Sequence, residues 1–288
     1  MEEEFARARE RLLAVAYGIT GDRGAAEDVV QEAWLRLVSS REPVDDVTGW
    51  LVVVTSRLAL DVVKSARHRR EQYVGQWLPE PLVELDADPA DRVTLDESVT
   101  LALLVVLETL SPAERTVFLL HEVFGLPFTE VAGVVGRTPA AVRQLASRAR
   151  RHVADRAPRF EPDPVRQRAV VSAFATACAG DDLGALLALL DPDVVLRSDG
   201  GGFVSAARNP VVGADRVARF LAGVQRRKPA ELRPVRVNGW AGLLRVHQGH
   251  PTGVMALTVA DGRVTAVDIV LNPEKLARVR AAHVEGTP

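Results

Sequence analysis

Apolar residues recur at helical spacing near the start of the chain. In the stretch GDRGAAEDVVQEAWLRL the recurring apolar positions are Val29, Val30, Ala33, Trp34 and Leu37. This spacing places them on one face of a helix, with the intervening polar residues on the other face. The next stretch, DVTGWLVVVTSRLALDVVKSARHRR, is apolar in its first half and basic at its end. The pattern predicts a helical domain over residues 1–72.

A proline-rich acidic stretch, EQYVGQWLPEPLVELDADPAD, interrupts the helical pattern. It holds three prolines and five carboxylates between Pro79 and Asp91. Proline and repulsion between like charges both favour an extended chain. The stretch also carries aromatic and apolar side chains that an inert spacer does not need: Tyr73, Trp77, Leu78 and Leu82. We therefore expect a linker over residues 73–90 that docks on another part of the protein.

Two helices joined by a tight glycine turn are predicted within residues 91–157. The tetrapeptide SPAE (Ser111–Glu114) is a capping box with proline at the first helical position, which marks a helix start. That helix buries Val117, Leu120 and Phe124 and stops near Gly125. A shorter helix follows and ends at Gly136, after which Thr138 and Pro139 start the next one. This arrangement is a helix-turn-helix.

The second helix of this pair, RTPAAVRQLASRARRHV, is basic. Its inner stripe is predicted to be Val142, Leu145, Ala146, Ala149 and Val153. Two outer rows follow helical spacing: Gln144, Arg148 and Arg151 in one, and Arg143, Ser147 and Arg150 in the other. The stretch contains no carboxylate to neutralise the arginines. It is either a solvated face or a surface for phosphates and base edges of DNA.

The pattern of predicted secondary structure changes after a second proline-rich linker, residues 158–165. Two helical stretches are followed by strands, and VMALTVADGRVTAVDIVLN predicts a hairpin that turns at Asp261 and Gly262. The stretch RVNGWAGLLRVHQ predicts one further strand. Helices followed by antiparallel strands indicate an α+β domain over residues 166–288.

Composition limits the classes of function. The chain has 288 residues and a formal net charge of −2, so contact with nucleic acid has to come from local basic patches. Its one cysteine, Cys178, fits a reducing compartment and is expected to be a packed small residue. The acidic start of the chain lacks a signal-peptide pattern, and the longest apolar run, Val99–Leu110, is short for a membrane span. We expect a soluble, cytoplasmic protein.

The order and spacing of three stretches carry a family resemblance. They are YGITGDRGAAEDVVQEAWLRL, GWLVVVTSRLALDVVKSARHRR and LETLSPAERTVFLLHEVFGLPFTEVAGVVGRTPAAVRQLASRAR. Together they resemble extracytoplasmic-function (ECF) sigma factors of bacterial RNA polymerase, with sigma regions 2 and 4. The remainder resembles a SnoaL-like, NTF2-type cone domain. Three short motifs, YVGQWLPEP, DGGG and NPEKL, are similar to those of the SigJ-like subgroup.

The resemblance implies a role for each surface. Sigma region 2 would bind the polymerase β′ clamp through Glu27, Asp28, Gln31, Glu32 and Trp34. The loop at residues 39–47 and the following helix would melt and read the −10 element, with Arg57, Asp61, Lys64 and Arg67 facing DNA. Region 4 would contact the β flap and read the −35 element with Thr138, Arg143, Gln144, Ser147, Arg148, Arg150 and Arg151.

The three short motifs are expected to meet and to regulate activity in cis. The residues assigned to this contact are Trp77, Leu78, Pro79, Asp199, Gly200, Gly201, Asn272, Pro273, Lys275 and Leu276. Such a contact would replace a dedicated anti-sigma factor. The predicted partners are core RNA polymerase and promoter DNA, with room for a small ligand in the cone. No cofactor, metal or membrane is expected.

Two other functions stay open. A stand-alone helix-turn-helix regulator would bind duplex promoter DNA without polymerase. An enzyme would need an acid or base with a shifted pKa in the cone, and the candidates are Asp199, His247, His250 and Asp268. Asp199 precedes three glycines and is more typical of a turn, and no spacing ties two of these residues together.

Overall fold

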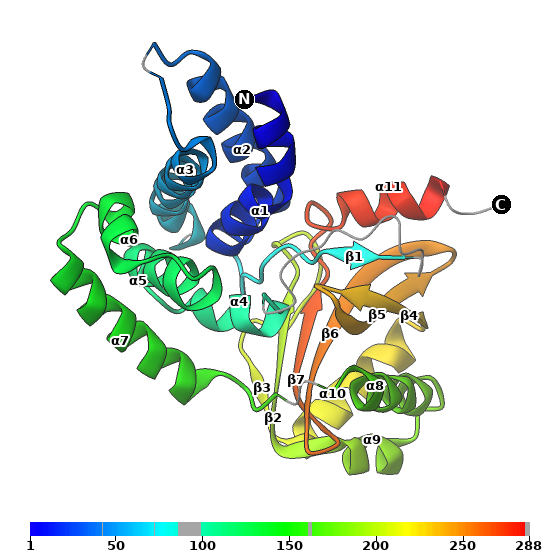
Figure 1. Cartoon of the computed structure of the whole chain (residues 1–288). Helices are drawn as coiled ribbons and strands as arrows, with labels where there is room; N and C mark the ends of the chain where they lie inside the picture. The colour runs from blue at the N-terminus through cyan, green and yellow to red at the C-terminus, as the bar shows by residue number, and fades with distance from the viewer. Residues whose placement is uncertain (42, 72, 86–98, 161–162, 286–288) are drawn as a thin grey trace. The chain divides into compact units, whose positions relative to one another are not determined.

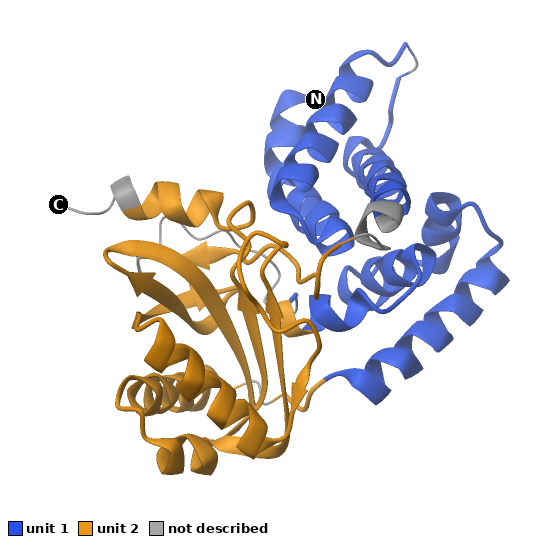
Figure 2. Cartoon of the chain, turned by 180° about the vertical axis from the view of Figure 1, so that it is seen from behind, with its two compact units in different colours: residues 1–72, 93–99, 103–157 blue, residues 73–92, 100–102, 158–288 orange. Residues whose placement is uncertain are grey.

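The computed structural model describes residues 1–41, 43–71, 73–85, 99–160 and 163–285. They fold into two compact units, coloured separately in Figure 2. Unit 1 holds residues 1–71, 99 and 103–157. Unit 2 holds residues 73–85, 100–102, 158–160 and 163–285. The described part of the first proline-rich stretch therefore belongs to the same unit as the C-terminal residues.

Unit 1 begins with three helices, drawn in blue in Figure 1. They are α1 (Glu2–Thr20), α2 (Arg23–Val38) and α3 (Val47–Glu71). Helix α1 ends at Gly21 in the left-handed conformation, and the Asp22 carboxylate accepts the Ala25 N–H at 2.8 Å to start α2. Buried side chains such as Leu12, Ile19 and Leu51 fill the space between the helices. The helical prediction for this segment is confirmed.

The remaining helices of unit 1 form the predicted helix-turn-helix. They are α5 (Pro112–Phe118), a π-helical turn η2 (Leu119–Val123), α6 (Phe128–Val135) and α7 (Pro139–Arg156), preceded by α4 (Leu101–Leu107). Ser111 and Glu114 complete the capping box in both directions. Gly136 has a φ of 66°, and the Thr138 hydroxyl accepts the Ala141 N–H. Phe124, expected to be buried, is only half-buried.

A buried arginine ties the two halves of unit 1 together. Arg115 on α5 is 2 % exposed, and its guanidinium donates two hydrogen bonds to the Gly18 carbonyl oxygen of α1, at 3.2 and 2.9 Å. The same guanidinium pairs with the Glu108 carboxylate. A buried charge is tolerated when its donors are satisfied in this way, so Arg115 fixes how α5 meets α1.

Unit 2 is an α+β domain, as predicted. Its helices are α8 (Pro164–Ala179), α9 (Leu183–Leu189), α10 (Ala214–Arg227) and α11 (Ala277–Glu285). Its strands are β1 (Val83–Glu84), β2 (Leu190–Asp199), β3 (Val211–Val212), β4 (Glu231–Val237), β5 (Trp240–His247), β6 (His250–Ala260) and β7 (Arg263–Val270). The sheet order is β1-β4-β5-β6-β7-β2-β3, antiparallel except for the β2–β7 pair.

Helices α8, α9 and α10 cover one face of this sheet (Figure 1). The core between them contains fully buried side chains of α8, α9 and the strands, among them Phe174, Leu186 and Leu196. Cys178 belongs to the same core at 6 % exposure, and burial raises the pKa of its thiol to about 12. It is therefore the packed small residue that was expected.

Tight turns join the strands. The predicted turn at Asp261 and Gly262 is present, with φ of 52° and 72°, which suits a type I′ hairpin. The strand predicted in RVNGWAGLLRVHQ is present as β5 but starts later, because Asn238 (φ 50°) and Gly239 (φ 81°) turn the chain and pair β4 with β5. Asn-Gly is a strong hairpin signal in its own right.

The linker supplies an edge strand to this sheet. Strand β1 pairs with β4 in antiparallel register, with Val83 opposite Val237 and Glu84 opposite Arg236. Next to this pair, the Leu82 N–H donates to the Asn238 side-chain oxygen at 3.1 Å, and the Asn238 N–H donates to the Leu82 carbonyl at 2.8 Å. The linker is thus extended and docked through residue 84, while residues 86–90 of the predicted linker lie outside the described residues.

Among the described helices none is long and apolar enough to cross a membrane. The described residues also hold no group of three or more His, Cys, Asp or Glu side chains that could hold a metal ion.

Candidate nucleic-acid interface and linker-binding cluster

Helix α7 presents the predicted polar surface. Its inner stripe is confirmed, with Val142, Ala146 and Ala149 at 1 % exposure or less and Leu145 and Val153 half-buried. The residues assigned to the −35 element are all exposed: Thr138, Arg143, Gln144, Ser147, Arg148, Arg150 and Arg151. Packing of the small inner residues fixes the helix and leaves the outer rows exposed.

The expectation that no carboxylate neutralises this helix is wrong for Arg150. The Glu122 side chain of η2 pairs with it at 2.6 Å, because the turn before α6 brings η2 beside α7. Arg143 lies 5.6 Å from the centre of the Phe128 ring. Arg148 carries no ion pair with any residue that the structure describes, so its charge is available to a polyanion.

Helix α3 carries the residues assigned to the −10 element. Arg57, Asp61 and Lys64 are exposed and follow one another at i, i+4 and i+7. Lys64 pairs with Asp61 at 3.1 Å, whereas Arg57 donates two hydrogen bonds, at 3.2 and 2.9 Å, to the Gly133 carbonyl oxygen of α6. Arg57 thus has to leave this carbonyl before it can contact a base. The Arg67 side chain lies outside the described residues.

Helix α2 carries the residues assigned to polymerase. Asp28 and Gln31 are exposed, whereas Glu27 pairs with Arg23 at 3.2 Å and Glu32 with Arg36 at 2.8 Å. Such exposed pairs within one helix are weak and can exchange partners. The Trp34 ring is half-buried and packs against Phe5, with 4.5 Å between ring centres, so it serves the helix packing of unit 1.

Three distant segments of unit 2 meet at the carboxylate of Asp199, which is fully buried at the end of β2. We call these contacts the Asp199 cluster. One carboxylate oxygen accepts the Tyr73 hydroxyl at 2.6 Å and the Gly201 N–H at 2.9 Å. The other accepts the Leu78 N–H at 2.9 Å and the Lys275 ammonium at 2.7 Å. Asp199 therefore both shapes the glycine turn, as expected, and holds the linker.

Lys275 reaches the linker at two further points. Its ammonium donates to the Leu78 carbonyl oxygen and lies 3.9 Å from the centre of the Trp77 ring. The Lys275 side chain is 10 % exposed, so its charge is largely removed from water and its attraction to Asp199 is little screened. The pKa of Tyr73 is raised by burial and by its hydrogen bond to Asp199. Tyr73 therefore stays a neutral donor.

Asn272 is the last member of the Asp199 cluster, and its position is one reason why Gly201 has to be glycine. Its amide nitrogen donates to the Tyr73 hydroxyl oxygen at 2.9 Å, and its oxygen accepts the Glu274 N–H at 3.0 Å. Gly201 has a φ of 65°, and a Cβ there would lie 2.5 Å from the Asn272 side chain. A Cβ on Gly200 would lie 2.2 Å from the Val204 carbonyl oxygen. The Asn272 side chain lies too close to Gly201, and the Val204 backbone too close to Gly200, for a Cβ at either position, so both positions require glycine.

The other residues assigned to this contact take packing positions. Leu78 and Leu276 are 1 % and 0 % exposed, Pro79 is buried, and Pro273 is half-buried. The structure brings together YVGQWLPEP, DGGG and NPEKL, the three motifs that were expected to meet. Tyr73 was noted only as an unusual aromatic residue of a spacer, and its hydroxyl proves to be central.

The four residues considered as catalytic groups lie apart. Both carboxylate oxygens of Asp199 accept hydrogen bonds within the cluster. Asp268 pairs with Arg197 at 3.0 Å. Burial raises the pKa of Asp268, and Arg197 opposes this effect. His250 is exposed at the start of β6. His247 bonds to the Pro229 carbonyl oxygen at 2.6 Å. No two of them form an acid–base pair.

Comparison with known proteins agrees with this architecture. Residues 5–69 match the family model for sigma-70 region 2, and residues 100–153 match the model for sigma-70 region 4. The chain is 44 % identical to the ECF RNA polymerase sigma factor SigJ of Mycobacterium tuberculosis over 287 residues, covering 94 % of this chain and 92 % of that protein. It is 42 % identical to the probable ECF sigma factor SigI of the same organism, covering 95 % and 93 %.

A solved structure gives the same result. The crystal structure of M. tuberculosis SigJ superposes with a TM-score of 0.80 at 38 % identity, covering 96 % of this chain and 98 % of that one. The chain thus belongs to the ECF RNA polymerase sigma factors. Within that family it is SigJ-like: regions 2 and 4, which serve promoter recognition, are followed by an α+β C-terminal domain.

Proposed function

We propose that the chain directs core RNA polymerase to promoters through three surfaces of unit 1. Helix α7 reads the −35 element, α3 reads the −10 element, and α2 meets the β′ clamp while region 4 meets the β flap. Support comes from the exposed, acid-free row Gln144, Arg148 and Arg151, whose side chains can reach phosphates and base edges. These interactions take place in the cytoplasm.

We further propose that unit 2 restrains this activity in cis by holding the linker. The observation that carries this proposal is the Asp199 cluster, in which one buried carboxylate binds Tyr73 and Leu78 of the linker together with Lys275. A sigma linker held by its own C-terminal domain is withdrawn from polymerase. Release of the linker thereby becomes a regulated step, and a dedicated anti-sigma factor is not required.

The cone is proposed to regulate and not to catalyse. Its candidate acids and bases are separated, with Asp199 in the cluster and Asp268 paired with Arg197. A general acid–base mechanism needs such groups beside a substrate, so the geometry favours binding over turnover. The proposed action needs no cofactor.

Run-off transcription with purified core polymerase tests both proposals. The full chain is compared on a genomic promoter library with an Arg148→Ala variant and a matched control, Arg219→Ala, which alters an exposed arginine of α10. Specific start sites that depend on polymerase and on Arg148, but not on Arg219, support the promoter assignment. Binding to promoter DNA without polymerase, with no initiation in its presence, would favour a stand-alone regulator.

The cis restraint is tested in the same assay with Tyr73→Phe, which weakens the cluster, and Val74→Ala as control, because Val74 is 59 % exposed. We expect more transcript from Tyr73→Phe than from Val74→Ala at subsaturating sigma concentration. Equal or lower yield from Tyr73→Phe contradicts a restraint exerted through the linker and leaves the promoter assignment intact.

A further inference from the structure

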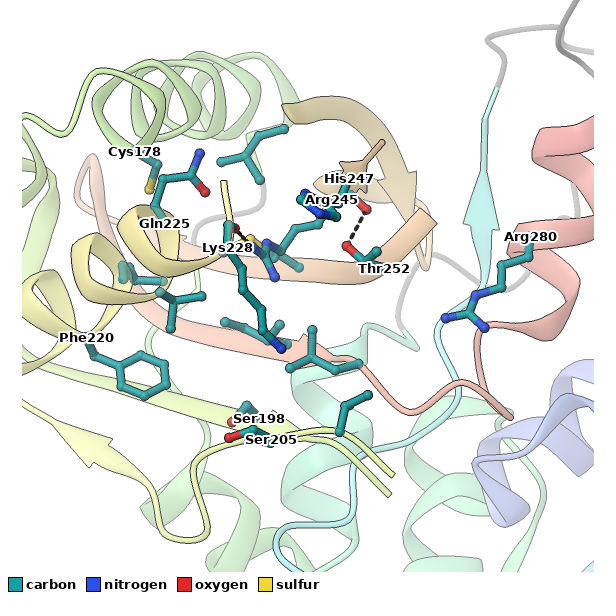
Figure 3. A pocket seen from close by; sticks show the side chains of 18 residues that line it. Cys178, Ser198, Ser205, Phe220, Gln225, Lys228, Arg245, His247, Thr252 and Arg280 are labelled. Atoms are coloured by element: carbon teal, nitrogen blue, oxygen red, sulfur yellow. Dashed lines mark hydrogen bonds between the residues drawn. The ribbon is translucent and has the colours of Figure 1, made fainter. Parts of the chain in front are cut away.

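Unit 2 encloses a cavity of about 400 Å³ between α10 and the sheet (Figure 3). Helix α10 contributes Phe220 and Leu221 to its wall, and the strands contribute Leu232, Met255 and Ile269. These side chains make most of the lining apolar. A concave, mostly apolar space of this size with a few convergent polar groups is typical of a small-molecule site.

Two cationic side chains, those of Arg245 and Lys228, line one end of the cavity. Figure 3 shows Arg245, His247 and Thr252 close together there, with the Lys228 side chain reaching into the space between α10 and the strands. Arg280 of α11 also lines the cavity, farther from this group. None of the described residues that line it is an aspartate or a glutamate. The sign of the charge at this end is therefore positive and uncompensated.

Arg245 carries the strongest argument for an anion. Its guanidinium donates one hydrogen bond, to the Lys228 carbonyl oxygen at 3.2 Å, and has no carboxylate partner in the part of the chain that the structure describes. Burial lowers its pKa, and the opposing effect comes from the Cys178 thiol and not from a carboxylate. Burying a guanidinium without an anion is costly, because four of its five N–H donors then depend on water or a ligand.

The ammonium of Lys228 adds a second cation on the same side. Lys228 follows α10 directly and lines the cavity, although the residue as a whole is exposed. Among the described residues it too lacks an ion pair. Two cations at one end of an apolar cavity fit a ligand with an anionic group and an apolar chain. The anionic group would pair with the cations, and the apolar chain would displace water from the apolar wall.

We propose that this cavity binds a small amphiphilic monocarboxylate, with the carboxylate at Arg245 and Lys228 and the apolar body against α10 and the strands. The residues that line this cavity are not those of the Asp199 cluster or of the unit 1 surfaces. It depends neither on the promoter assignment nor on the cis restraint. Little in the sequence points to this site, because Arg245 has the pattern of an ordinary outward residue in an alternating strand.

Titration calorimetry on the full chain tests the proposal with three probes of equal chain length: octanoate, 1-octanol and octylamine. We expect octanoate to bind at least about tenfold more tightly than 1-octanol, as a charge-assisted contact implies. Octylamine should bind more weakly than 1-octanol, because the cavity repels a cation. If 1-octanol or octylamine binds as tightly as octanoate, or if octanoate at millimolar concentration gives no binding, the proposal is wrong.

Variants locate the site. Lys228→Gln and Arg245→Met should each weaken octanoate about tenfold and change 1-octanol by less than about twofold. Arg227→Gln is the matched control, because Arg227 is exposed and adjacent to Lys228 but does not line the cavity. Arg245→Met removes a buried charge, so its melting temperature should not fall, which separates lost binding from lost folding. An equal loss in Arg227→Gln, or unchanged octanoate affinity in both cavity variants, overturns the assignment.

Discussion

Replacing Tyr73 by phenylalanine removes one hydroxyl from the Asp199 cluster and leaves the rest of the linker unchanged. The hydroxyl donates to the Asp199 carboxylate at 2.6 Å and accepts from the Asn272 amide at 2.9 Å. The Gly201 N–H still donates to the same carboxylate oxygen, so this oxygen keeps one hydrogen-bond donor. The Asn272 amide loses its acceptor. The variant thus loosens the linker without dismantling the turn.

The expected cost follows from these two contacts. A hydrogen bond to a charged group contributes about 1.5–3 kcal/mol, and a half-buried ring retains its packing in phenylalanine. We take about 2 kcal/mol, which corresponds to about a 30-fold change in the equilibrium between docked and released linker. Core positions of unit 2 such as Phe174 lie outside the cluster, so the stability of the sheet should change little.

Hydrogen–deuterium exchange measures this equilibrium directly. The Leu78 N–H is bonded to Asp199 and the Leu82 N–H to Asn238, so both amides exchange only when the linker opens. In Tyr73→Phe we expect exchange of the Leu78 amide to accelerate about 30-fold. Val74→Ala is the control at an exposed position of the same segment, where little change is expected.

Two outcomes would refute this reasoning. Unchanged exchange at Leu78 in Tyr73→Phe would mean that the hydroxyl does not hold the linker. Equal acceleration throughout β6 and β7 would mean that the variant destabilises unit 2 as a whole, and that the linker is not a separate opening unit.

Three further predictions concern other parts of the chain. Arg148→Ala should weaken binding to the −35 element by about 1–3 kcal/mol if Arg148 reads a base. If Arg148 contacts a phosphate instead, the variant should lower the magnitude of the salt slope of binding by about 0.9. Binding measured across salt concentrations distinguishes the two, and an unchanged affinity and slope would exclude contact with DNA. Gly201→Ala should accelerate Leu78 exchange at least as much as Tyr73→Phe, because its φ of 65° and a Cβ at 2.5 Å from Asn272 both oppose a side chain. Cys178 should react with iodoacetamide at pH 8 about a thousandfold more slowly than free cysteine, because a thiol whose pKa is about 12 is almost wholly protonated there; rapid alkylation in the folded chain would contradict its burial.

The helix-turn-helix could be predicted because its signals are local. The capping box at Ser111 lies within one helical turn, as do Gly136 and Thr138 between α6 and α7. The inner stripe of α7 follows from periodicity alone. What the local pattern could not show is the Arg150–Glu122 pair, because the two residues come from different helices that meet through the turn.

The Asp199 cluster could be anticipated only as a meeting of motifs. Its donors Tyr73, Leu78 and Lys275 stand 126, 121 and 76 positions from Asp199, so no spacing rule connects them. A carboxylate before three glycines is typical of a turn, and the Gly201 contact agrees with that interpretation. The other hydrogen bonds that the Asp199 carboxylate accepts could be assigned only from the tertiary structure.

Strand β1 shows why the linker was hard to interpret. Two prolines at positions 79 and 81 disfavour regular structure, so the stretch predicts an extended spacer. The strand nevertheless forms after them, at the edge of the sheet, where only one side needs partners. Apolar Leu78 and Leu82 were the available signal, since side chains that are 1 % and 9 % exposed require a surface to cover them.

A linker held within its own chain has consequences for how polymerase is captured. The cluster is intramolecular, so its occupancy does not fall on dilution as that of a separate inhibitor would. If the docked form outnumbers the released form by about a hundredfold, the apparent affinity of polymerase for a released linker falls by about the same factor. Only about 3 kcal/mol of docking free energy is needed for that ratio. The hydrogen bonds of Asp199 to Tyr73, Leu78 and Lys275 are of the right magnitude to supply it, and the loss of any one should lower the barrier to initiation measurably.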